Sequence, residues 1–234
     1  EDEKKSLEVT QAIMRSMMGR VGRKAAVPEA KAELVTGHKK ELDSYFEAQK
    51  KSVVESRSFD PKEWNPKLAT VLAALGTVTS KAVGQRTATE LGSEYNASEL
   101  SGYIKANSKI SAKKINWAIL DKLTEQGNLE DFSDEELATI FDEKVGYRSS
   151  EIATTRVAII AGLAALYAAR QGKAKYKTWV TTSANPRSSH AQVAGETVPI
   201  EEKFSNGMEH PGDYESGAEN VANCQCYIEY STEK

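Results

Sequence analysis

The feature that most constrains the fold is an apolar run in the second half of the chain. From Val157 to Ala169 nearly every residue is apolar, and the run is closed by Arg156 and Arg170. A helix that is apolar all round has no face suited to water, so it must be buried. The run is shorter than the roughly 20 residues that a bilayer requires, so we expect no membrane partner. The sequence therefore predicts a buried central helix.

Helical patterns cover most of the chain before and around this run. One amphipathic helix should start near Pro28 and end near Arg57, and a second should start at Asn65–Pro66 with Asn65 as its N-cap. The second helix should end near Gly92. Further helices are expected over residues 98–106, from Ser111 to Gly127, from Ser133 to Gly146, and from Ser150 to about Gln171. The third of these begins with a capping-box pattern, Ser133 to Glu136.

The helical period disappears after Gly172. Three short β-prone segments follow, at residues 176–182, 196–200 and 224–230, separated by turn residues. The predicted fold class is therefore α+β, with a mainly α-helical N-terminal region followed by a small β-rich C-terminal module.

The chain divides into three expected domains. Residues 1–60 form N-terminal helices, 61–147 a further helical region, and 148–234 the C-terminal domain. In the first domain, residues 1–25 carry an apolar stripe at helical spacing that suits packing: Leu7, Ile13, Met14, Met17, Met18 and Val21. The first residue is Glu rather than Met, which favours a processed product or a fragment.

The charge balance argues against tight nucleic-acid binding by the C-terminal module. The net charge of the chain is -3, and residues 171–234 hold six Lys and Arg against nine Asp and Glu. Affinity for phosphate rests on Lys and Arg that neutralise it. We expect any contact with DNA to be weak.

A metal site is the first candidate for chemistry in the module. Cys224 and Cys226 are the only cysteines, and an i, i+2 pair on a strand points to one face. With His190, and with His210 or Asp213 as a fourth ligand, they would suit zinc. The spacing also favours a reducing compartment, because it does not form a disulfide framework.

Three other readings of these residues stay open. The cysteines could be small buried hydrophobes beside a surface histidine. Either cysteine could instead be a nucleophile activated by His190 or His210. Phosphate binding through Arg187, Gly195 and Gly212 is the third, although no glycine-rich phosphate loop is present and these glycines favour turns.

One ordered set of residues extends through the whole C-terminal module. It comprises Lys177 and Trp179, Arg187 and His190, Gly195 and Val198, Phe204, Pro211–Gly212–Asp213, and Asn223–Cys224–Gln225–Cys226. In order and spacing it resembles the C-terminal domain of the phage Mu F-like proteins, a minor head or head morphogenesis family of tailed phages. The resemblance covers about residues 148–230. Three positions depart from the family pattern: Asn185 replaces an Asp, Gln225 an Arg, and Arg156 a Glu.

The resemblance implies a minor head protein that acts in head morphogenesis. Such a protein associates with the portal vertex and with DNA packaging or delivery, and in some phages the domain follows a portal protein in one chain. The expected partners are the portal protein and other head proteins, with phage DNA bound weakly if at all. The expected location is the virion, and the host cytoplasm during assembly. An enzyme is not expected; the alternative is a metal- or Cys-dependent hydrolase delivered with phage DNA.

Overall fold

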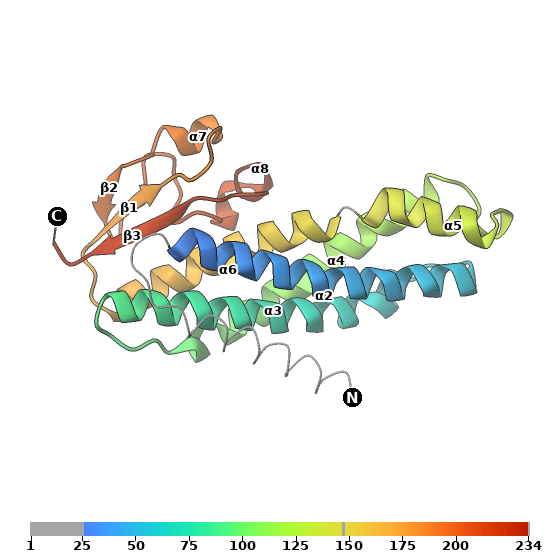
Figure 1. Cartoon of the computed structure of the whole chain (residues 1–234), viewed down its shortest axis with the longest axis horizontal. Coiled ribbons are helices and arrows are strands. Elements are labelled where there is room, and N and C mark those ends of the chain that lie inside the picture. The colour runs from blue at the N-terminus through green and yellow to red at the C-terminus, as the bar shows by residue number, and fades with distance from the viewer. Residues whose placement is uncertain (1–25, 147, 234) are drawn as a thin grey trace. The chain divides into compact units, whose positions relative to one another are not determined.

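A computed structural model of the chain describes residues 26–146 and 148–233 (Figure 1). The helices are α2 (Ala26–Ser56), α3 (Pro61–Glu90), α4 (Ser101–Thr124), α5 (Asp134–Phe141), α6 (Arg148–Gln171), α7 (Ser188–Ala191) and α8 (Ala218–Val221). The strands are β1 (Tyr176–Val180), β2 (Thr197–Pro199) and β3 (Tyr227–Ser231). Short 3₁₀-helical turns lie at Ala97–Leu100, Leu129–Asp131 and Tyr214–Ser216, and a π-helical turn lies at Asp142–Gly146. The predicted α+β class, helices followed by a small β module, is confirmed. The predicted stripe of residues 1–25 lies outside the described residues.

The chain forms two compact units built from separate stretches of sequence. Within the described residues, the first unit contains residues 26–35, 76–100 and 154–233, and the second contains 36–75 and 101–153. Three of the boundaries between them fall inside α2, α3 and α6, and the fourth lies between Leu100 and Ser101, where α4 begins. The three consecutive domains expected from the sequence stay predictions.

The second unit has a buried polar network at its centre. Gln49 and Asn116 are fully buried, and the Gln49 amide donates to Asn116 Oδ1 at 3.0 Å and to the Tyr45 hydroxyl at 2.9 Å. The Asn116 amide in turn donates to Asn65 Oδ1 at 3.0 Å. Buried amides are costly without partners, so this network selects one packing of α2, α3 and α4.

The predicted start of α3 at Asn65 is wrong. The helix begins at Pro61, where the Asp60 carboxylate accepts a hydrogen bond from the Lys62 amide at 2.8 Å. Asp60–Pro61 is as good a cap and first residue as Asn65–Pro66. Asn65 is used instead by the buried network, and Pro66 lies inside the helix at the cost of one backbone hydrogen bond.

The two helices expected over residues 98–106 and from Ser111 are one helix, α4. Ser111 is half-buried inside it and does not cap a helix. No glycine or proline separates the two segments, so nothing in the backbone interrupts the turns. The capping box of α5 is confirmed: the Glu136 amide donates to Ser133 Oγ, and the Glu136 carboxylate accepts from the Ser133 amide.

In the first unit, α6 is the buried helix that its composition requires. Different sides of it pack in different clusters: Val157 and Ala161 with the start of α2 and the end of α3, Ala158 with the core of the β module, and Leu166 and Ala169 against Ile200. By length and composition alone α6 could cross a membrane, but 67% of its most apolar window is buried inside the protein. A soluble core helix has the same property, so this is weak evidence for a membrane.

The sheet of the first unit has the order β2-β1-β3, with both pairs antiparallel (Figure 1). All three expected strands are present. The side chains of Lys177 and Trp179 alternate with partly exposed neighbours and face the core. The third strand begins at Tyr227 rather than near residue 224, so Cys224 and Cys226 precede it.

Candidate metal centre

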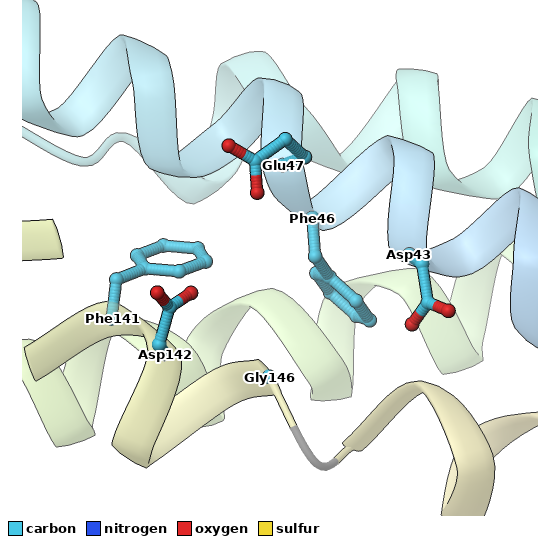
Figure 2. A pocket seen from close by; sticks show the side chains of 6 residues that line it. All are labelled: Asp43, Phe46, Glu47, Phe141, Asp142 and Gly146. Atoms are coloured by element: carbon cyan, nitrogen blue, oxygen red, sulfur yellow. The ribbon is translucent and has the colours of Figure 1, made fainter. Parts of the chain in front are cut away.

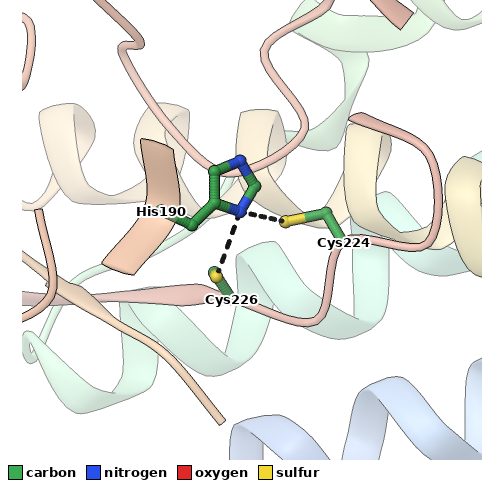
Figure 3. A group of neighbouring side chains, drawn as sticks. All are labelled: His190, Cys224 and Cys226. Atoms are coloured by element: carbon green, nitrogen blue, oxygen red, sulfur yellow. Dashed lines mark hydrogen bonds between the residues drawn. The ribbon is translucent and has the colours of Figure 1, made fainter. Parts of the chain in front are cut away.

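His190 and both cysteines meet in one buried cluster in the first unit (Figure 3). His190 Nδ1 lies 3.5 Å from Cys226 Sγ and 3.8 Å from Cys224 Sγ, and the three candidate ligand atoms all lie within 4.8 Å of one another. The cysteines are each 3% exposed and His190 is 2% exposed, so the alternative of a surface histidine is wrong. The cluster is a set of soft donors that could hold a metal ion.

Both cysteine side chains point toward His190 although the cysteines are not in a strand (Figure 3). They lie in the irregular segment between α8 and β3, after Asn223, whose φ of 54° is in the left-handed region that asparagine tolerates. The Asn223 amide donates to Thr155 Oγ1 of α6 at 3.2 Å. This turn, rather than strand alternation, aims both sulfurs at His190.

Hydrogen bonds between loops hold the histidine side of the cluster. Arg187, just before α7, donates from Nη2 to the carbonyl of Ala222. In α7, Ser189 Oγ donates to Asn220 Oδ1 of α8 at 3.0 Å. Because these bonds join the segment carrying His190 to the segment preceding the cysteines, the spacing of the donors is set before any metal binds.

An aromatic core supports the cluster. Trp179 is fully buried, and its ring meets His190 and Phe204 edge to face, at centroid distances of 5.3 and 5.2 Å. Cys224 and Cys226 belong to the same hydrophobic cluster as these aromatics. The amide of Gly195, at φ +80°, donates to the Trp179 carbonyl at 2.8 Å, which closes the hairpin between β1 and β2.

The pKa values of the two thiols are shifted in opposite directions. The pKa of Cys224 is held well below its ordinary value, chiefly by a hydrogen bond from Cys226, with His190 and Lys31 adding to the effect against burial. The pKa of Cys226 is raised above its ordinary value because its proton is held by Cys224 and because it is buried. One proton is thus shared by the pair, and a divalent cation would be needed to make both sulfurs anionic.

Lys31 is a contributor that the sequence analysis missed. It lies near the start of α2, is only 9% exposed, and donates from Nζ to the carbonyl of Cys226 at 2.8 Å. Burial lowers the Lys31 pKa, whereas Cys224 and Cys226 oppose that shift. The contact joins residues 195 positions apart, and no local pattern around Lys31 signals it.

His210 and Asp213 lie outside this cluster. Both are buried, and both organise their own turn. His210 Nδ1 lies 3.0 Å from the Pro211 carbonyl, and the Asp213 carboxylate accepts from the amides of Glu209 at 2.9 Å and Glu215 at 3.1 Å. Within the described residues, the only histidine, cysteine and acidic side chains gathered closely enough to ligate one ion are therefore His190, Cys224 and Cys226.

The turn that contains His210 is pressed against α6. Gly212 has φ +83°, and a Cβ on it would lie 2.6 Å from the Ala158 carbonyl. Facing it, a Cβ on Gly162 would lie 2.1 Å from the Pro211 carbonyl. The Pro211–Gly212–Asp213 motif is thus explained by packing, since only glycines allow this approach.

Lys177 holds the same turn, residues 209–213, through a hydrogen bond. It is 1% exposed, donates from Nζ to the Glu209 carbonyl at 2.9 Å, and lies over the Phe204 ring. Burial lowers the Lys177 pKa to about 8, against the opposing effects of Glu209 and Asp213. Within the described part of the chain the Lys177 ammonium donates to one carbonyl, and a buried ammonium with so little support is less stable than the neutral amine.

This gives a pH prediction for Lys177. Between pH 8 and 10.5, the folded lysine is largely neutral while the unfolded lysine is still protonated. The unfolded state then binds more protons, so the free energy of unfolding should rise with pH across this window, by about 1.4 kcal/mol per unit at most. Below pH 8 both states are protonated and the contribution is flat.

The measurement is urea unfolding from pH 7 to 10.5 of the wild type and Lys177→Met. The rise should be missing in Lys177→Met and retained in the control Lys175→Met, because Lys175 is exposed. Parallel curves for the wild type and Lys177→Met would contradict the prediction.

The second unit has a pocket of a different kind (Figure 2). Phe46 and Phe141 line it together with Asp43, Glu47 and Asp142. Lysines already pair with the carboxylates: Lys39 with Asp43, and Lys50 with both Glu47 and Asp142. Burial raises the Asp43 pKa, but hydrogen bonds from Lys39 and Ser149 outweigh it and hold that pKa below its ordinary value. Each of the three carboxylates that line the pocket is therefore paired with a lysine.

Comparisons of the chain with protein families, with curated proteins and with solved structures find no match. The resemblance to the Mu F-like proteins therefore stays a prediction that rests on the motif residues. Of these, Trp179, Phe204, His190 and both cysteines lie in or against one core cluster.

Proposed function

We propose that this chain is a minor phage head protein that acts in head morphogenesis. In this proposal it associates with the portal vertex and with DNA packaging or delivery, and the Cys–His cluster serves to stabilise the C-terminal module. The support is the ordered motif of that module together with the structural use of its residues. Lys177, Gly212 and Asp213 each hold the turn at residues 209–213.

The observation that carries the structural role is the burial of the cluster in a hydrophobic core. Cys224 and Cys226 pack in one cluster with Trp179, Phe204 and Met208. A nucleophilic cysteine must reach its substrate, whereas Cys224 and Cys226 are each only 3% exposed. The burial favours a stabilising site over the alternative, a metal- or Cys-dependent hydrolase delivered with phage DNA.

Zinc is the metal that we propose for the cluster. Two thiolates and one imidazole are ligands that zinc prefers, and a structural zinc takes a fourth protein ligand, which the described histidine, cysteine and acidic side chains do not bring to this cluster. Binding would release the proton shared by Cys224 and Cys226. His190 would bind through Nδ1, the atom that faces both sulfurs. A histidine that binds a metal usually donates its other ring N–H to a carboxylate, a carbonyl or a water. His190 differs, because its Nε2 has no hydrogen-bond partner in the described part of the protein.

The test of the metal role is elemental analysis of the purified chain, with thermal unfolding followed before and after a chelator. We expect about one zinc per chain, and a lower Tm once it is removed. His190→Ala should abolish metal binding. The matched control is His210→Ala, which removes another buried imidazole from the same module but should leave the zinc content unchanged.

Two results would contradict the metal proposal. One is a purified wild-type chain that contains no metal and whose Tm does not change when the chelator is added. The other is equal loss of zinc in His190→Ala and His210→Ala, which would show that metal content reports only folding.

The head-protein role has its own test. Mass spectrometry of purified virions should find the chain at low copy number, and inactivating its gene should reduce the yield of filled heads. Binding to the portal protein should persist in salt, whereas any binding to DNA should be weak and steeply salt-dependent. Absence from virions, with normal heads after inactivation, would overturn this role.

A further inference from the structure

One face of α4, in the second unit, exposes large apolar side chains. Of the large hydrophobic residues most exposed in the described part of the chain, three lie on this helix: Tyr103 at 39%, Ile110 at 54% and Trp117 at 42%. The opposite face of α4 is buried, with Ile104, Ile119 and Leu123 each at 2% or less. The helix is therefore apolar on both sides, and one of them faces outward.

The exposed residues follow a heptad. Tyr103, Ile110 and Trp117 are seven residues apart, and the positions three residues after each of them are occupied by Ala106, Lys113 and Leu120. Such spacing forms a seam of the kind along which a second helix packs. At 1.5 Å per residue the seam from Tyr103 to Trp117 is about 21 Å long, enough for three turns of a partner helix to bury its apolar side.

Lysines border this seam. Lys109 and Lys114 lie beside it at helical spacing and Lys113 lies within it; all three are exposed, and Asp121 is the only acidic residue in α4. The seam and its border, which we call the α4 face, therefore present an apolar line within a positive field. An apolar line with flanking charge of one sign selects a partner of the opposite sign.

We propose that the α4 face binds an acidic amphipathic helix of another protein. The partner's apolar residues would cover Tyr103, Ile110 and Trp117, and its flanking Glu or Asp would pair with the lysines. The inference is independent of the metal centre and of the head-protein role, since it rests only on residues of α4.

The charges and the spacing disfavour the other occupants. Residues 1–25 carry six Lys and Arg against four Asp and Glu, and a second α4 face would set lysines against lysines. A single nucleic-acid strand needs closely spaced stacking platforms. Here the two aromatic residues are separated by an aliphatic one, Ile110, that cannot stack with a base.

The test uses the full chain and a synthetic peptide about three heptads long, with Leu along one stripe and Glu on its flanks. Acrylamide quenching reads out binding, because Trp117 is 42% exposed while Trp64 and Trp179 are 7% and 0% exposed. The acidic peptide should protect Trp117 from the quencher. A peptide with Lys in place of each Glu should not protect it.

Variants of the α4 face should raise the Kd of the acidic peptide by roughly tenfold or more. They are Ile110→Asp, which interrupts the seam, and the pair Lys109→Glu and Lys113→Glu, which reverses the charge beside and within it. Because these side chains are exposed, circular dichroism and Tm should match the wild type. Tyr214→Asp removes an exposed aromatic residue outside α4 and should bind the peptide normally.

Four outcomes would overturn the proposal. Neither peptide protects Trp117, or both protect it equally. A single-stranded oligonucleotide protects Trp117 better than the acidic peptide, which would identify a nucleic-acid surface. Protection increases with protein concentration alone, which would identify a second copy of the chain as the occupant.

Discussion

Replacing Gly162 with alanine is expected to lower the free energy of unfolding by about 2–3 kcal/mol. The new Cβ would lie 2.1 Å from the Pro211 carbonyl and 2.6 Å from His210 Nδ1. A backbone carbonyl cannot move aside as a flexible side chain can. The turn at residues 209–213 would therefore have to leave α6, and its contacts with Lys177 would weaken.

The control for this variant is Gly102→Ala. Gly102 is exposed in α4, and a Cβ there would meet nothing within 4 Å. Alanine should be neutral or stabilising at this position, by up to about 1 kcal/mol, because it has the higher helix propensity. Urea unfolding followed by circular dichroism measures both variants. Wild-type stability in Gly162→Ala would mean that the turn does not pack closely on α6.

Trp179→Ala should have the largest effect in the chain, a loss of about 3–5 kcal/mol. Trp179 is fully buried between His190 and Phe204, so its removal leaves a cavity at the centre of the β module. The substitution also removes the indole ring against which His190 packs. We therefore expect weaker metal binding in the same variant.

Trp117→Ala is the matched control, because it removes the same side chain from an exposed position. Its stability should stay within about 0.5 kcal/mol of the wild type. Chemical denaturation gives the two free energies, and elemental analysis gives the metal content. If the two tryptophan variants were equally stable, the packing around Trp179 would have to be looser than described.

Several elements of the fold could be predicted because their signals are local. The capping box of α5 needs only Ser133 and Glu136, three residues apart, and it forms as expected. The strands β1 and β2 follow from short β-prone segments bounded by turns. The loss of helical period after Gly172 likewise marks the end of α6 at Gln171.

The errors arose where two local signals competed. Asp60–Pro61 and Asn65–Pro66 are equivalent helix starts, and the choice depends on Asn116, which takes the Asn65 side chain across 51 residues. Ser111 has the chemistry of a cap but lies half-buried in the interior of α4. A local pattern cannot register a partner so far along the chain.

The candidate centre shows the same division. Sequence order alone selected His190, Cys224 and Cys226, because their donor types and the Cys-x-Cys spacing suit metal binding. It also selected His210 and Asp213, which hold their own turn instead, and it omitted Lys31. These outcomes depend on which loops meet, and that is set by the packing of the module on α6.

The sequence by itself determined that residues 157–169 must be buried and that a small β module follows Gly172. Both conclusions depend only on the free energy of exposing apolar side chains and on backbone preferences, which act wherever the segment lies. The tertiary structure alone decided that the cysteines face His190 from outside a strand, that Lys31 reaches Cys226, and that Tyr103, Ile110 and Trp117 face outward. These are relations between distant segments, and each exists only once the core has brought those segments together.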